Sequence, residues 1–146
     1  MKSTVYHWAL AVAAWAGFIV SFFLPAFDQM PGWRAAGLQG IFWQQATQGN
    51  WLAVHYILLT LANLAMLVSP YFIIRGAQDV LFIKWLRGLS VAAAVLVLLF
   101  PVLLQTIHMA RDLRVGYFLW AGSFVLLCLA AILQPISLKV KALETI

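Results

Sequence analysis

Two histidines are the residues of this sequence best suited to hold a cofactor. His55 lies one turn into a long apolar segment, and His108 ends the next such segment. If these segments cross a membrane in opposite directions, the two imidazoles occupy the same leaflet, where neutral imidazole can ligate haem iron or another metal. No flanking glycine pattern forms a haem slot, so local hydrogen bonding is the simpler interpretation. We therefore expect no metal site and no bound cofactor, with haem or quinone binding left open.

A polar cluster surrounds the second histidine at the end of its segment. It consists of His108, Arg111, Asp112 and Arg114. Such a group could hold an anionic lipid headgroup, the edge of a quinone ring or an acidic loop of a partner. The simpler alternative is a solvated turn in which Asp112 offsets the charge of the two arginines.

The middle of each apolar segment carries no Asp, Glu, Lys or Arg. Proton- and ion-coupled transporters usually place a titratable group there, because the chemistry needs one away from water. Asn63 is the main polar residue at that depth, and we expect its amide to bond to another helix or a backbone carbonyl, worth about 0.6–2 kcal/mol. The sequence also lacks paired carboxylates, a nucleophile elbow, an HExxH motif and a glycine-rich phosphate loop. We therefore expect that the protein is not an enzyme.

Small residues recur every four positions along the first apolar segment, at Ala9, Ala13, Gly17 and Ser21. Helices in lipid associate by close packing across small residues, because no hydrophobic force drives them together. The four residues therefore predict a contact face. Its partner is either another helix of this chain or a second protein, in a homo-oligomer or a larger complex.

The composition indicates which elements position these residues. The chain has 146 residues, of which 65% are hydrophobic and 9% charged, and its mean hydropathy is +0.98. A soluble globular domain has about 25% charged residues, so these values exclude a soluble enzyme, a disordered chain and a nucleic-acid-binding domain. The net charge of +5 then reflects the Lys/Arg bias of membrane proteins, and no nucleic-acid partner is expected.

Four segments are long enough to cross a bilayer, which takes about 20 apolar residues. Within a single domain over residues 1–146 they are 6–27, 51–74, 88–107 and 116–134, and a start of the third as early as Leu81 is also open. The predicted fold is an all-α integral membrane protein with four transmembrane helices in a bundle. Pro101 should free the backbone carbonyl of Val97 and kink the third helix.

The distribution of Lys and Arg predicts the orientation of this bundle. The N-terminus, the second loop and the C-terminal tail carry six of them, whereas the first and third loops carry three. The positive-inside rule therefore places both termini in the cytoplasm and the long first loop, 28–50, on the outer side.

The first loop combines helical spacing with aromatic residues. Leu38, Ile41 and Phe42 predict a short helix lying in the membrane interface, with a partner-binding segment as the alternative. The tryptophans fit two aromatic belts at opposite membrane faces: Trp33, Trp43 and Trp51 on the loop side, and Trp8 and Trp85 on the other.

Several short motifs of the chain are of a kind common in membrane proteins. Leu24-Pro25-Ala26-Phe27 closes the first segment, Pro31-Gly32-Trp33 and Gly37 lie in the loop, Trp51-Leu52-Ala53 and Asn63 follow, and Gly116-Tyr117-Phe118-Leu119-Trp120 with Ser123 opens the last segment. In these motifs the chain resembles a loose group of small, uncharacterised bacterial inner-membrane proteins with four helices. The resemblance implies a multi-pass protein of the bacterial inner membrane and implies no activity.

The leading functional hypothesis is a non-catalytic accessory or assembly subunit of a bacterial inner-membrane complex, for which an energy-transducing complex is one plausible host. Its partners would be the lipid bilayer and other membrane-protein subunits, or a second copy of itself. Three alternatives remain open. They are a small homo-oligomeric transporter or channel, a haem-binding redox protein that uses His55 and His108, and an immunity factor against a membrane-targeting toxin.

Overall fold

Four long helices make up most of the computed structural model, which describes residues 2–37, 39–76, 80–105 and 109–134. They are α1 (Lys2–Ser21), α4 (Trp51–Gly76), α5 (Val80–Gln105) and α6 (Val115–Leu133). Three segments, Trp51–Arg75, Val80–Gln105 and Val115–Leu133, are long and apolar enough to cross a membrane, with mean hydropathies of 2.1, 2.3 and 2.1. The described apolar part of α1, Tyr6–Ser21, is shorter. The prediction of a helical, membrane-compatible chain is confirmed, while the fourth span and the side on which the termini lie stay predictions.

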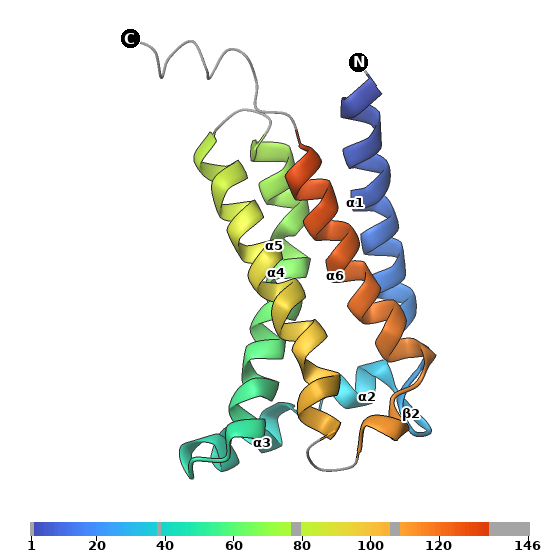
Figure 1. Cartoon of the computed structure of the whole chain (residues 1–146), viewed down its shortest axis with the longest axis vertical. Helices are drawn as coiled ribbons and strands as arrows, with labels where there is room; N and C mark the ends of the chain where they lie inside the picture. The colour runs from blue at the N-terminus through green and yellow to red at the C-terminus, as the bar shows by residue number, and fades with distance from the viewer. Residues whose placement is uncertain (1, 38, 77–79, 106–108, 135–146) are drawn as a thin grey trace.

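The long helices pack in the spatial order α1, α6, α5, α4. The first helix packs mainly on the last one, and α5 lies between α6 and α4. Figure 1 shows α1 at one edge, with its N-terminal end beside the C-terminal end of α6. The chain therefore brings its first and last helices together and leaves one side of α1 without a neighbour among the described elements.

Proline interrupts the hydrogen bonding of α4 and α5, and each gap is filled by a side chain. Pro70 has no N–H for the Met66 carbonyl, and the Ser69 hydroxyl donates to that carbonyl at 2.7 Å. The Trp15 indole N–H of α1 in turn donates to the Ser69 hydroxyl oxygen at 3.2 Å. Repairing this gap therefore links α1 to α4.

The second gap lies in α5, where Pro101 leaves the Val97 carbonyl without its helical donor. The buried Tyr117 hydroxyl of α6 donates to this carbonyl at 2.6 Å. The freed carbonyl expected from the sequence is thus present and paired. Because an unpaired polar group in hydrocarbon costs several kcal/mol, this bond fixes how α6 lies against α5.

Arg87 and Gln134 join helices α4, α5 and α6 at the C-terminal end of α6. The Arg87 guanidinium donates to the carbonyls of Ala131, Ile132 and Gln134 at 3.0, 3.2 and 2.9 Å, where α6 has run out of its own amide donors. The Gln134 side-chain amide donates to the Ile73 carbonyl of α4 at 2.9 Å. A charged residue of α5 thus serves as a helix cap for α6.

The first predicted segment, 6–27, is too long, because α1 ends at Ser21. Residues Pro25–Phe27 form strand β1, which pairs antiparallel with β2 (Met30–Pro31). Pro25 carries no amide donor and disfavours helical backbone at the preceding residue. Asp28 adopts a positive φ of 51° in the turn between the strands. Residues 22–27 therefore turn back over the end of the bundle.

The other boundaries differ less, except at the start of α5. The predicted second and fourth spans, 51–74 and 116–134, begin and end within two residues of helices α4 and α6. Helix α5 begins at Val80 rather than 88, close to the earlier start at Leu81, so the second loop is much shorter than expected. Lys84 and Arg87, which were expected in that loop, lie inside α5. Helix α5 can contain them near its end because long basic side chains there can reach polar surroundings. Residues 106–107 lie outside the described part.

The first loop contains two short helices, α2 (Gly32–Gly37) and α3 (Gln39–Thr47), where one was expected. The latter packs beside the start of α4 (Figure 1). Leu38 lies outside the described residues, as does the side chain of Ile41. The interfacial position of this loop stays a prediction.

The pairing of Tyr117 with the proline-freed carbonyl can be tested by a double-mutant cycle. Tyr117→Phe should lower the free energy of unfolding by about 1–2 kcal/mol, because the Val97 carbonyl loses its donor. In a Pro101→Ala background, residue 101 regains an amide N–H that can bond to the Val97 carbonyl. The loss of unfolding free energy caused by Tyr117→Phe should then be less than about half of its value in the wild-type background. Unfolding by SDS titration in mixed micelles measures both. Equal costs in the two backgrounds would contradict this role of the hydroxyl.

Candidate functional site

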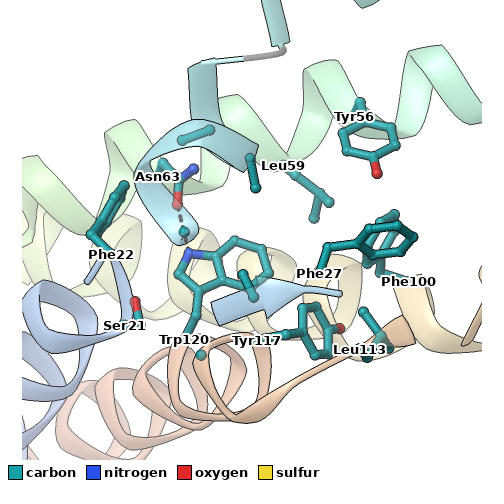
Figure 2. A pocket seen from close by; sticks show the side chains of 15 residues that line it. Ser21, Phe22, Phe27, Tyr56, Leu59, Asn63, Phe100, Leu113, Tyr117 and Trp120 are labelled. Carbon is teal, nitrogen blue, oxygen red and sulfur yellow. Dashed lines mark hydrogen bonds between the residues drawn. The ribbon is translucent and has the colours of Figure 1, made fainter. Parts of the chain in front are cut away.

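A cavity of about 90 Å³ lies beneath the first loop, between the C-terminal end of α1 and helices α4, α5 and α6. Figure 2 shows its lining from close by. Aromatic rings dominate the walls: Phe22, Phe27, Tyr56, Phe100, Tyr117 and Trp120. A single water needs only about 10–15 Å³, so the cavity has room for a larger group than one water.

The β1–β2 turn and α2 form a lid over this cavity through close backbone contacts. The Gly32 amide donates to the Leu24 carbonyl and the Trp33 amide to the Phe22 carbonyl, both at 3.0 Å. A Cβ on Gly32 would lie 2.5 Å from the Ser21 carbonyl oxygen, and one on Gly116 would lie 2.7 Å from that of Pro25. These two positions therefore require glycine, and they seat the lid on α1 and α6.

The third loop holds the other edge of the lid. The Asp28 amide donates to the Asp112 carbonyl at 2.7 Å, and the Arg114 amide donates to the Ala26 carbonyl at 3.1 Å. The Arg114 guanidinium also lies 3.7 Å from the Asp28 carboxylate, with both side chains largely exposed. The lid is thus fixed mainly by backbone bonds, because an exposed ion pair contributes only about 0–1 kcal/mol.

The predicted polar cluster is only partly assembled by these contacts. Arg111 is exposed and Asp112 half-buried on the short helix Ala110–Asp112, while His108 lies outside the described residues. Arg114 pairs with Asp28 of the first loop, where Asp112 was expected to balance the arginines. Among the described residues the cluster therefore serves to join the two loops.

A chain of ring contacts runs through one wall of the cavity. Phe42 of α3 stacks on Tyr56 with centroids 4.3 Å apart, and Tyr56 meets the edge of Phe100 at 5.2 Å. Phe100 contacts Tyr117 at 5.8 Å, and Tyr117 contacts Trp120 at 5.6 Å. Four elements thus contribute rings to one continuous wall, which favours a fixed cavity shape.

Asn63 provides the main polar group of this apolar wall. The Trp120 indole N–H of α6 donates to the Asn63 side-chain oxygen of α4 at 2.8 Å (Figure 2). An indole nitrogen only donates, so the amide oxygen must face it and the amide nitrogen must face elsewhere. Asn63 therefore joins two helices and keeps a donor group at the cavity.

His55 is not part of the cavity lining, but it stacks on Phe100, which is. Its buried imidazole stacks on that ring at 5.7 Å with an interplanar angle of 4°, and it makes a hydrogen bond with the Leu96 backbone. Its Nε2 atom has no partner among the described residues. His108 is not described, and the described residues contain no group of three or more metal-ligating side chains. Ligation by a histidine pair stays a prediction.

The four small residues of α1 do not share one side of the helix. Ser21 is buried at the cavity, and Gly17 is half-buried with its Cβ position 2.7 Å from the Ser123 hydroxyl oxygen. Ala9 and Ala13 are exposed. A four-residue repeat advances about 40° per step on a helix with 3.6 residues per turn, so Ala9 points about 120° away from Ser21. The predicted face is therefore split into an inner and an outer part.

Sequence reasoning missed the cavity, although one of its walls has a readable pattern. Tyr56, Leu59 and Asn63 follow at i, i+3 and i+7, and so lie on one face of α4. Tyr117 and Trp120 share a face of α6 by the same rule. The lid residues carry no such signal, because Ala26 and Phe27 fall in the predicted first span and Gly32, Ala35 and Ala36 in the first loop.

The sequence matches no protein-family model, and no curated protein or solved structure matches it either. The function of this chain is therefore inferred from its own residues and geometry. The resemblance to small bacterial four-helix membrane proteins stays a prediction.

A matched pair of glycine substitutions tests the seat of the lid. Gly116→Ala should lower the free energy of unfolding by about 1–3 kcal/mol, because the added methyl overlaps the carbonyls of Leu24 and Pro25. Gly122→Ala in the same helix has nothing within 4 Å and should be neutral or stabilising by up to about 1 kcal/mol. Unfolding in micelles gives both values, and similar effects of the two substitutions would refute the close approach at Gly116.

Proposed function

We propose that this protein is a non-catalytic accessory or assembly subunit of a bacterial inner-membrane protein complex, with an energy-transducing complex as one fitting host. The observation that carries the proposal is the outer face of α1. Ala9, Ala13 and Ala16 are all exposed there, and their spacing places them within one narrow stripe of the helix. This stripe lies on the side of α1 that faces away from its own bundle.

Small exposed side chains favour a helix partner over lipid. Large exposed residues that suit contact with lipid chains occur on α4 and α5, such as Leu61, Leu64, Val95 and Leu98, and also on α1 at Val12, Ile19 and Val20, so that the alanines form a small-residue patch beside them. Alanines let a second backbone approach closely, and close packing is what stabilises helix pairs in a membrane. The outer stripe of α1 therefore fits a helix of another subunit.

The proposed orientation places both termini in the cytoplasm and the lid on the outer side, with α1 as the fourth membrane span. The Lys and Arg bias supports it. Exposed tryptophans add support, because Trp33, Trp43 and Trp51 lie at the lid end, while Trp8 and Trp85 lie toward the other end of their helices. Tryptophan is enriched where a membrane protein meets the lipid headgroups.

A non-catalytic role is favoured by the chemistry of the helices. Charged side chains are missing from the central parts of the apolar segments, so general acid–base catalysis at that depth has no carboxylate or lysine to use. Several polar side chains instead bond one helix to another, as those of Trp15, Tyr117 and Trp120 do. This pattern is typical of a protein whose role is to hold its own shape and that of its neighbours.

Two leucine substitutions on the outer stripe test the proposal. Ala9→Leu with Ala13→Leu should leave folding intact and abolish copurification of other subunits, because the added side chains prevent close approach. Ala92→Leu places the same change on an exposed position of α5 and should leave association intact. Gly17→Leu is unsuitable here, since Gly17 contacts Ser123 within the chain.

The readout is native mass spectrometry of protein extracted gently from its own membranes. Wild type and Ala92→Leu should carry heterologous subunits in fixed stoichiometry, and the double variant should not. A bare homo-oligomer in the wild type would overturn the accessory role and favour a transporter or channel. Retention of all subunits by the double variant would show that the stripe is not the interface.

A further inference from the structure

We propose that the cavity under the lid binds a neutral, lipid-soluble ring that carries two carbonyl oxygens, the chemistry of a quinone head group. This inference goes beyond the accessory role and does not depend on it. It rests on three features of the described lining: flat aromatic walls, no charged side chain, and polar groups left over that can act as donors.

The walls select a flat, uncharged ligand. Rings from Phe27, Tyr56, Phe100 and Trp120 face the space from different helices and from the lid (Figure 2). Aromatic faces and edges pack well against another ring. An ionised lipid headgroup would lose its water here without meeting an opposite charge, which is strongly unfavourable.

Asn63 supplies the first donor. Its side-chain oxygen is occupied by the Trp120 indole, which fixes the orientation of the amide. The amide nitrogen has no hydrogen-bond partner among the described residues, and the side chain lines the cavity. Asn63 is half-buried, and a ligand carbonyl at this point would give its amide nitrogen an acceptor.

Tyr56 supplies the second donor, two helical turns before Asn63 on the same face of α4. Its ring is held between Phe42 and Phe100, at 4.3 and 5.2 Å between centroids. Figure 2 shows its hydroxyl directed toward the space beside Phe100. In the described part of the chain this hydroxyl makes no hydrogen bond, whereas that of Tyr117 is already used on Val97.

The position of the cavity fits a ligand that arrives from the lipid phase. Tyr56 and Asn63 lie five and twelve residues after Trp51, which is about 8 and 18 Å along the helix. The cavity therefore lies within the apolar length of α4 and extends toward the lid end. A ring with an apolar tail can reach this depth from the membrane.

Menadione and methylnaphthalene form a matched pair of probes, because they share ring system and methyl group and differ in the two carbonyls. Isothermal titration of the full-length protein in detergent should show saturable one-to-one binding of menadione. Methylnaphthalene should bind at least about 10-fold more weakly, because it leaves both donors unpaired.

Variants locate the bound ring. Tyr56→Phe should weaken menadione binding about 5- to 10-fold, since it removes one hydrogen bond and keeps the ring. Tyr71→Phe makes the same change on the exposed far part of α4 and should have no effect. Ala36→Phe, which fills the cavity from the lid, should abolish binding.

The proposal is overturned if menadione does not bind, or if both probes bind equally well. It is also overturned if Tyr56→Phe binds menadione as tightly as Tyr71→Phe, because the ring would then lie elsewhere. Since Tyr56→Phe keeps the aromatic packing, this comparison decides the matter even if Ala36→Phe fails to fold. Failure of these tests leaves subunit association untouched, so the two proposals fail separately.

Discussion

The structure depends on one constraint, which is that hydrocarbon offers no partner for a free backbone carbonyl. Pro70 and Pro101 each free one carbonyl inside a long apolar helix. The Ser69 hydroxyl bonds to the first and the Tyr117 hydroxyl to the second. Through these repairs α4 is linked to Trp15 of α1, and α5 to α6. Hydrogen bonds that complete single helices therefore also fix how the helices lie together.

The cavity follows from the same contacts. Tyr117 is held by its hydroxyl against α5, and its ring forms part of the cavity wall. Trp120, one turn further along α6, is held by Asn63 of α4. Side chains fixed in this way cannot collapse into the space between the helices, and the lid closes over them through backbone bonds at Gly32 and Trp33. A shaped apolar space with fixed donors is the usual form of a ligand site.

Sequence reasoning predicted the apolar helices well, because length and hydropathy dominate their formation. It also anticipated the freed carbonyl of Val97, since a proline's missing amide is a local fact. It did not find the turn at Pro25–Pro31, where apolar composition resembled a span but two prolines opposed helix. It treated Ala9, Ala13, Gly17 and Ser21 as one face, although the 3.6-residue period separates them. The cavity depends on residues from the lid and four helices, and such long-range proximity leaves no local pattern in a sequence.

The most direct test of this account is the proximity of the Tyr117 hydroxyl group to the Val97 carbonyl in a lipid bilayer. Solid-state NMR on protein labelled with ¹³C at the tyrosine ring and at valine carbonyls measures it through dipolar transfer. The account predicts a strong cross-peak between the Tyr117 ring carbon that bears oxygen and the Val97 carbonyl carbon. It also predicts that this cross-peak disappears in Tyr117→Leu. Absence of the cross-peak in the folded wild-type protein would contradict the account, because α5 and α6 would then lie together without the bond that positions the cavity.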